Sequence, residues 1–512
     1  MSWFKNQGRQ VYSTGYHTTR NFFIGSPEAE AESTENSQIN LFDVFEDFLD
    51  IFPKLEYEKF IITGRKGTGK SAIAESIFMK KSSELFCDFV KIKDFDSQKI
   101  MHANSNTGEI NQVHKLLFEW TLLIKLVNLL LSNQAILRAK EIHLLRKFIE
   151  KNSGKVGLSS FEVTEMTNSA SIEIEIEQLK RFIGNKFKKD IAIKSTKAPF
   201  YKVLPALRET VISLLKEDKR NGNSYVIFFD DLDIGFNKNE PAKVENIIGL
   251  LRLAKDYNID IFGKQGLDVK LIILLRDDIK SAIVNYSADT AKIFSSYEIP
   301  LQWYNQSMYL NDEDSLPLKC LIDKRIKLNL DRNKIPATGK SPWDTLIDFQ
   351  PNNGSSFKYV LDFTYLKPRD IILFFKPISD IGYKIPLQFD EVKRLIKSMT
   401  NEIVMELKNE ISAVFTPSQI KGIFYLLSKL VERTRFDLDE AQELFENNKI
   451  EDIIDIKDVI IILYDYSIIG NIDGFDRVHF KYRSNPDDPS KVNLTQQFIL
   501  HKSLINYFIN KY

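Results

Sequence analysis

The stretch KFIITGRKGTGKSAIAESI, residues 59–77, constrains the fold more than any other part of the chain. An apolar run ends at Gly64, and the residues from Gly64 to Ser71 match G-x-x-x-x-G-K-[ST] at every defined position. Glycines let backbone N–H groups turn inward around phosphate oxygens, and a helix beginning at Ser71 adds the positive end of its dipole. The stretch therefore predicts a strand, a phosphate-binding loop and a helix, rather than a glycine-rich surface turn.

The loop residues have separate expected roles in binding ATP and Mg²⁺. Lys70 is expected to reach the β- and γ-phosphates, and Ser71 is expected to ligate Mg²⁺. The expected phosphate-binding set is Gly64, Gly67, Thr68, Gly69, Lys70, Ser71 and Ala72.

The second half of such a site is an apolar strand that ends in acids, and VIFFDD at 226–231 supplies it. Asp230 is placed to hold Mg²⁺, directly or through water, and Asp231 to polarise an attacking water molecule. Two acids at a strand end can also simply cap a loop. The phosphate loop upstream favours the functional interpretation.

A further apolar strand is predicted in LIILLRDD, residues 271–278. A strand that lies between the acidic strand and the phosphate loop places a polar residue near the γ-phosphate, and Arg276 is the candidate. The alternative is a surface arginine paired with Asp277 or Asp278. The sequence leaves these two interpretations open.

Strands and helices alternate through the first 300 residues, which predicts an α/β fold with a parallel sheet covered on both faces. The expected strands lie at 59–63, 88–92, 224–233, 269–275 and 297–301, and the expected helices include 41–52 and 199–217. The alternating segment SIEIEIE at 171–177 is expected to be a strand, paired with 190–195 as a hairpin.

From about residue 303 the pattern becomes mainly helical, and 455–509 suggests a helix, a wing, a strand and a helix. The predicted domains are an N-terminal segment (1–40), an ATPase domain (41–302, with a helical insert at about 100–200), a helical lid (303–415) and a winged-helix-like domain (416–512).

Four segments together resemble the STAND and origin-recognition-like branch of the AAA+-related P-loop ATPases, of the kind found among bacterial defence genes. They are FFIGSPEAEAE (22–32), the Gly64–Ser71 loop, FFDDLD (228–233) and ILLR (273–276). The resemblance implies an adenine pocket lined by Ile24 and Gly25. It also implies a lid-domain helix in YLKPRDIILFF (365–375), where Arg369 is similar to an arginine that senses the γ-phosphate. Many hydrolysing relatives carry glutamate where this chain has Asp231, which leaves efficient hydrolysis less certain.

Two features raise the question of nucleic-acid binding. Residues 179–202 hold eight Lys/Arg and one acid, interleaved with aromatic residues that could stack on bases. The favoured alternative is that these cations pair with Glu173, Glu175 and Glu177 across strands. Residues 416–512 hold 12 Lys/Arg and 15 Asp/Glu, so a DNA-reading role is not favoured there, and Lys481 and Arg483 are its only candidate contacts.

Composition excludes several other classes of protein. The 512-residue chain has a formal net charge of zero, so no overall field attracts nucleic acid or anionic membrane. Two cysteines, the absence of a secretory signal pattern and an apolar stretch (116–131) interrupted by Glu119 and Lys125 favour a cytoplasmic protein. The six histidines show no metal-ligand spacing.

The sequence therefore predicts a Mg²⁺-ATP-binding ATPase that acts as a nucleotide-dependent switch. Its expected partner is a separately encoded protein or effector, and a homo-oligomer is expected. Two alternatives stay open: a nucleic-acid-binding ATPase resembling loaders or repair proteins, and a scaffold that binds nucleotide without hydrolysing it.

Overall fold

A computed structural model of the chain describes residues 17–91, 110–136, 140–152, 173–183, 196–233, 236, 240–351, 354–412, 414–447, 455–483 and 491–511. The chain divides into two compact units. One unit runs from Leu49 to Leu301, and the other joins the chain before Leu49 to the chain from Gln302 onward. We call them the sheet unit and the helical unit.

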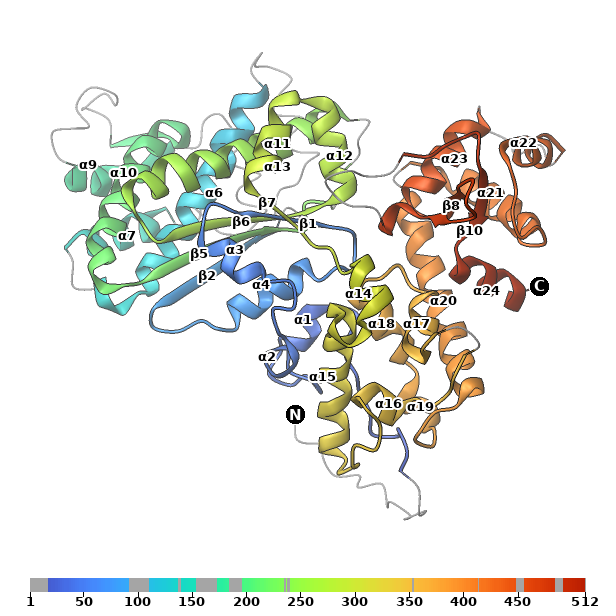
Figure 1. Ribbon diagram of the computed structural model, residues 1–512. Helices are drawn as coiled ribbons and strands as arrows, with labels where there is room; N and C mark the ends of the chain where they lie inside the picture. The colour runs from blue at the N-terminus through green and yellow to red at the C-terminus, as the bar shows by residue number, and fades with distance from the viewer. Residues whose placement is uncertain are drawn as a thin grey trace. The chain divides into compact units, whose positions relative to one another are not determined.

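A five-stranded parallel sheet forms the centre of the sheet unit (Figure 1). Its strands are β1 (Ile61–Gly64), β2 (Leu85–Lys91), β5 (Ser224–Asp230), β6 (Val269–Arg276) and β7 (Glu298–Pro300), in the order β2-β5-β6-β1-β7. The prediction that a strand separates the acidic strand from the phosphate-loop strand is confirmed, because β6 lies between β5 and β1. Parallel strands bring their carboxyl ends to one edge, which places both halves of the predicted site at the same end of the sheet.

Helices cover both faces of this sheet, as the alternating pattern predicts. Helix α6 packs on β2 and β5 and α11 packs on β6, whereas α4 lies on the opposite side of the sheet from α11 (Figure 1). The helices of this unit are α3 (Ile51–Glu56), α4 (Lys70–Phe78), α6 (Ile110–Ser132), α7 (Lys140–Lys151), α9 (Glu177–Ile183), α10 (Phe200–Asp218), α11 (Pro241–Lys255), α12 (Asp277–Tyr286) and α13 (Ala288–Tyr297). Strand side chains such as Ile61, Ile227 and Ile273 are fully buried between the two layers.

Two details of the sequence prediction are wrong. The expected helix at 41–52 is two short helices, α2 (Leu41–Val44) and α3, and the boundary between the units falls between them. The apolar residues up to Phe48 belong to the helical unit and those from Leu49 belong to the sheet unit. The spacing of the pattern therefore does not describe one helix. The strand β3 (Glu173–Glu175) is shorter than expected and pairs with β4 (Lys197–Pro199). The expected partner at 190–195 lies outside the described residues.

The helical unit carries a three-stranded antiparallel sheet in the order β10-β8-β9 near its end. Its strands are β8 (Ile469–Ile472), β9 (Val478–His479) and β10 (Gln497–Leu500). Its helices are α1 (Ala29–Glu32), α2, α14 (Gln306–Asn311), α15 (Pro317–Arg332), α16 (Pro342–Leu346), α17 (Ser356–Leu361), α18 (Pro368–Phe375), α19 (Ile378–Ile381), α20 (Phe389–Ile411), α21 (Pro417–Leu430), α22 (Leu438–Asn447), α23 (Ile456–Asp465) and α24 (Lys502–Lys511). Among the residues that the structure describes, no helix is both long and apolar enough to cross a membrane.

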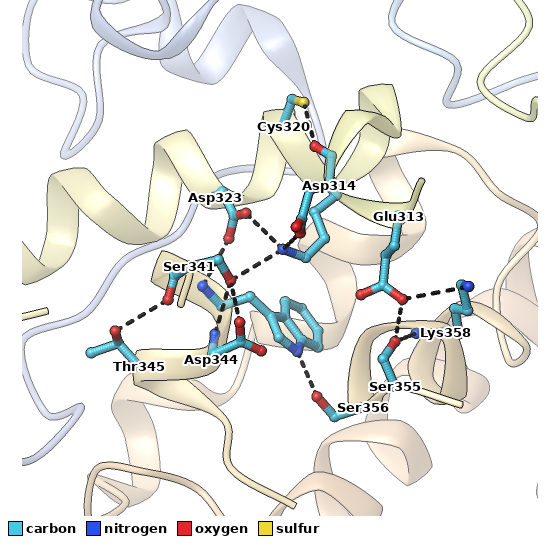
Figure 2. A network of polar contacts seen from close by, with 12 residues as sticks. Glu313, Asp314, Cys320, Asp323, Ser341, Asp344, Thr345, Ser355, Ser356 and Lys358 are labelled. Atoms are coloured by element: carbon cyan, nitrogen blue, oxygen red, sulfur yellow. Dashed lines mark hydrogen bonds and ion pairs between the residues drawn. The ribbon is translucent and has the colours of Figure 1, made fainter. Parts of the chain in front are cut away.

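A network of polar contacts in the helical unit includes Asp314, Asp323 and Ser341 (Figure 2), and these three residues surround a buried lysine. The side chain of Lys319, on α15, is only 2% exposed. Its ammonium donates to Asp314 Oδ1 at 3.0 Å, Asp323 Oδ2 at 3.1 Å and Ser341 Oγ at 3.1 Å. A lysine ammonium has three donors, so these three acceptors satisfy it completely. Although burial alone lowers the pKa of Lys319, its pairing with Asp323 and Asp314 produces a net increase.

Candidate functional site

The phosphate loop follows β1 and turns directly into α4. Gly67 and Gly69 have φ angles of 83° and 92°, a left-handed conformation that side chains other than glycine rarely adopt. A Cβ atom on Gly64 would lie 2.5 Å from Thr68 Oγ1, so a side chain is excluded there as well. All three glycines of the motif are therefore required by the shape of the loop.

Leu301, the residue after β7, contacts the strand and the first glycine of this loop. The backbone N–H of Leu301 donates to Thr63 O at 2.8 Å. Leu301 Cβ would lie 3.3 Å from a Cβ at Gly64. Leu301 is also the last residue of the sheet unit.

Lys70 is bound by the loop's own backbone. Its Nζ donates to Gly64 O at 2.8 Å and to Arg65 O at 3.1 Å. Burial lowers the pKa of Lys70 to about 8, and the charge of Asp277 is the strongest opposing influence. Within the described part of the chain these two carbonyls are its hydrogen-bond acceptors, so one of its three donors is left for an anionic ligand.

A hydrogen bond joins the phosphate loop to the acidic strand. Ser71 Oγ donates to Asp230 Oδ2 at 2.9 Å, across 159 residues of sequence. Burial raises the pKa of Asp230, although the N–H of Asp231 and the Ser71 hydroxyl both oppose the increase. A hydroxyl and a carboxylate in contact are oxygen ligands of the type that Mg²⁺ prefers. The structure thus brings together the two residues that the sequence named as Mg²⁺ ligands.

Asp231 adopts a left-handed backbone conformation with φ 57° at the end of β5. Its N–H donates to Asp230 Oδ1 at 2.8 Å. Its carboxylate pairs with Lys91, with Oδ2 lying 3.6 Å from Nζ. Sequence reasoning missed Lys91, because only the pairing of β2 with β5 places it opposite Asp230.

Arg276 is held by two carboxylates. Its Nη1 lies 2.9 Å from Asp233 Oδ2 and its Nη2 lies 2.6 Å from Asp278 Oδ2. Burial acts to lower the pKa of Arg276, but the two acids raise it overall. Asp278 is one of the two acids named in the alternative interpretation. Asp277 follows directly, and burial raises its pKa against the opposing charge of Lys70.

The remaining expected site residues are placed differently. Ala72 lies in the first turn of α4 and is partly buried. Ile24, Gly25 and Arg369 belong to the helical unit. Arg369 Nε donates to Pro27 O at 3.0 Å and its Nη1 donates to Glu406 Oε1 at 3.1 Å.

A buried ion pair fixes the FFIG segment. Arg325 donates to both carboxylate oxygens of Glu32 at 2.8 Å and to Ile24 O at 3.0 Å. A Cβ atom on Gly25 would lie 2.2 Å from Arg325 Nη1, which explains glycine at this position by packing alone. Ile24 is itself 2% exposed.

Three of the cations considered for nucleic-acid binding have acidic partners inside the chain. Arg181 pairs with Glu177 on the same helix. Lys481 bonds to Asp465, and Arg483 lies 3.5 Å from Asp362 Oδ1. Half of the basic segment 179–202, residues 184–195, lies outside the described residues.

No protein-family model matches the chain, and a search of the curated proteins finds no match either. The described residues contain no cluster of three or more His, Cys, Asp or Glu side chains arranged to hold a metal ion by themselves. The Ser71–Asp230 pair instead suits a Mg²⁺ ion that takes its other ligands from phosphate and water. The left-handed glycines, the incompletely satisfied ammonium and the hydroxyl–carboxylate pair together fit a Mg²⁺-nucleotide.

Proposed function

We propose that this protein is a P-loop ATPase that binds Mg²⁺-ATP and hydrolyses it slowly, as a nucleotide-dependent switch. The observation that carries the proposal is the hydrogen bond between Ser71 and Asp230. It joins the first turn of α4, which follows the phosphate loop, to the end of the acidic strand, although β6 separates that strand from β1. A Mg²⁺-nucleotide site requires these two parts to meet.

Each residue of the site has a role in this proposal. Lys70 directs its remaining donor to phosphate oxygens. Ser71 and Asp230 would hold Mg²⁺, which would neutralise phosphate charge. Asp231 orients a water molecule and accepts its proton as the water oxygen bonds to the γ-phosphorus and the bond to the β–γ bridging oxygen breaks. The products are ADP and phosphate, and the proton passes from Asp231 to solvent.

The switching part of the proposal concerns the helical unit. Arg369 lies at the start of α18 and bonds to Glu406, a carboxylate that it can exchange for a phosphate. We propose that residues 303–415 act as a lid that responds to nucleotide, and that the winged-helix-like residues 416–512 pass the response to a partner protein in an oligomer. Pairing of the described wing cations within the chain favours a protein partner over DNA.

The test is ATP binding and steady-state ATP hydrolysis by the purified chain and by Lys70→Ala. Charge-assisted hydrogen bonds contribute roughly 1.5–3 kcal/mol, so we expect Lys70→Ala to weaken ATP binding by about 10- to 100-fold. Lys80→Ala is the matched control, because Lys80 follows the other end of α4 and its ammonium lies over the ring of Phe52. It should bind ATP like the wild type.

The same assay with duplex and single-stranded DNA separates the alternatives. Turnover that DNA strongly stimulates, and that Lys70→Ala abolishes, would favour the nucleic-acid-binding ATPase. Tight ATP binding with no turnover would favour the scaffold. Equal ATP binding by Lys70→Ala and the wild type would contradict all three functions.

A further inference from the structure

The carboxyl end of the edge strand β2 carries a cation that the expected reaction does not use. Lys91 is the last residue of β2 and pairs in register with Asp230 of β5. Its Nζ lies 3.6 Å from Asp231 Oδ2, and the two side chains are 25% and 29% exposed. A lysine therefore contacts the acid that we assign to orienting water.

The strand order fixes the direction in which this contact acts. β2 and β6 flank β5 on opposite sides, and β1 with its phosphate loop lies beyond β6. Lys91 therefore lies on the side of β5 away from β1, the strand from which the phosphate loop starts. An ion pair with Lys91 holds the Asp231 carboxylate toward the β2 side of the acidic strand end.

The neighbouring acid cannot take over the role of Asp231 while it holds its present contacts. Asp230 accepts from the N–H of Asp231 on one oxygen and from the hydroxyl of Ser71 on the other. These bonds orient Asp230 toward the loop and leave Asp231 as the acid that has to move.

We propose that Lys91 is a positioning residue that restrains turnover by holding Asp231 on the side of β5 away from the phosphate loop. This inference rests on the proposed ATPase function. A partly exposed ion pair is weak, typically 0.2–1 kcal/mol, so it can be broken in every catalytic cycle. Its removal should raise kcat by about two- to fivefold, because one kcal/mol corresponds to about a fivefold change in an equilibrium.

The experiment compares the wild type with Lys91→Gln, Lys91→Arg and Lys125→Gln. Lys125 is the matched control because its Nζ pairs with Asp88, on the same strand, at 2.9 Å. We expect Lys91→Gln to raise kcat while the Kd for ATP stays unchanged. Lys91→Arg keeps the cation and should retain the wild-type rate, as should Lys125→Gln. In an Asp231→Asn background, Lys91→Gln should have no effect on the residual rate.

A second measurement tests the ion pair without ATP. Acylation of Lys91 by an amine-reactive reagent, quantified by peptide mass spectrometry, should become faster in Asp231→Asn and remain unchanged in Asp88→Asn. This readout also detects a variant that fails to fold, because all buried lysines would then react faster.

The outcomes separate this inference from the proposed function. If the wild type binds no ATP, the proposed function fails and the inference fails with it. If the wild type binds ATP but Lys91→Gln has a lower, equal or undetectable kcat, the restraint is wrong while ATP binding stands. Unchanged acylation of Lys91 in Asp231→Asn would contradict the ion pair itself.

Discussion

Lys70 in the sheet unit is partly buried and Lys319 in the helical unit is almost fully buried, and the groups that surround the two ammonium ions differ in kind. Lys319 donates to two carboxylates and a hydroxyl, and its pKa is raised overall. Lys70 donates to two neutral backbone carbonyls, and burial lowers its pKa to about 8. The Lys319 ammonium has a complete set of anionic and polar partners. The Lys70 ammonium is charged at neutral pH without a bonded anion.

The comparison shows that burial of a charge does not by itself indicate function. A buried ammonium with three acceptors stabilises the fold and has no donor left for a ligand. An ammonium that donates only to backbone carbonyls has no bonded anion to balance its charge, and a phosphate can supply that anion. Removal of the two lysines should therefore have opposite consequences for stability and binding.

The largest expected effect is on the fold. Lys319→Met should lower the free energy of unfolding by about 3 kcal/mol, because it leaves the largely buried Asp323 without its cation. Urea denaturation measures the loss. The double variant Lys319→Met/Asp323→Asn should recover part of it, since the uncompensated charge is gone. A loss below about 1 kcal/mol in the single variant would show that the network is not stabilising.

The next largest expected effect is on the pH dependence of stability, which should distinguish Lys70 from Lys319. The pKa of Lys70 is about 8 in the folded chain against 10.5 as the ordinary value, so between these pH values the unfolded chain binds more protons. The cost of burying the charged ammonium is therefore fully present below about pH 8 and disappears as the pH rises to 10.5. This contribution is on the order of 3 kcal/mol.

The measurement compares the stability of the wild type and Lys70→Met from pH 7 to pH 10.5. The wild type should gain stability relative to the variant across this range, and the difference isolates Lys70 from Lys270, whose pKa burial also lowers to about 8. Bound ATP should hold Lys70 protonated, so ATP affinity should fall above about pH 8. A stability difference that does not change with pH would contradict the lowered pKa.

The smallest expected effect concerns Arg276, a cation of the site that already has two carboxylate partners. Arg276→Gln leaves Asp233 and Asp278 uncompensated near the expected phosphate position, and we expect ATP affinity to fall about three- to fivefold, or roughly 1 kcal/mol. Removing Asp278 as well, in Arg276→Gln/Asp278→Asn, should restore part of the affinity. A fall in kcat above about 100-fold with unchanged affinity would instead show that Arg276 acts on the γ-phosphate.

The parts of the site that could be predicted from sequence are those encoded by neighbouring residues. The phosphate loop is a local motif, in which Gly67 and Gly69 are needed by their left-handed backbone and Gly64 by the close approach of Thr68. The acids Asp230 and Asp231 end an apolar run, and β6 contains the apolar run Leu271–Leu275. Parallel strands with helices between them then place these ends together, as the structure shows.

The remaining contacts depend on pairings between distant segments. Lys91 meets Asp231 only because β2 and β5 pair in one particular register. Glu32 and Arg325 are 293 residues apart, and neither has a sequence neighbour that points to the other. The helix expected at 41–52 failed for a related reason, since its two apolar halves belong to separate units and periodicity does not record which core a residue enters.

Leu301 connects the point where the chain leaves the sheet unit to the strand that precedes the phosphate loop. Its backbone N–H is bonded to Thr63, on the strand that carries the loop, and the polypeptide leaves the unit at the next residue. Tension applied to the chain beyond Leu301 is therefore first borne by the hydrogen bond to β1, one residue before the phosphate loop begins. The exit of the polypeptide and the strand that precedes the phosphate loop therefore share one hydrogen bond.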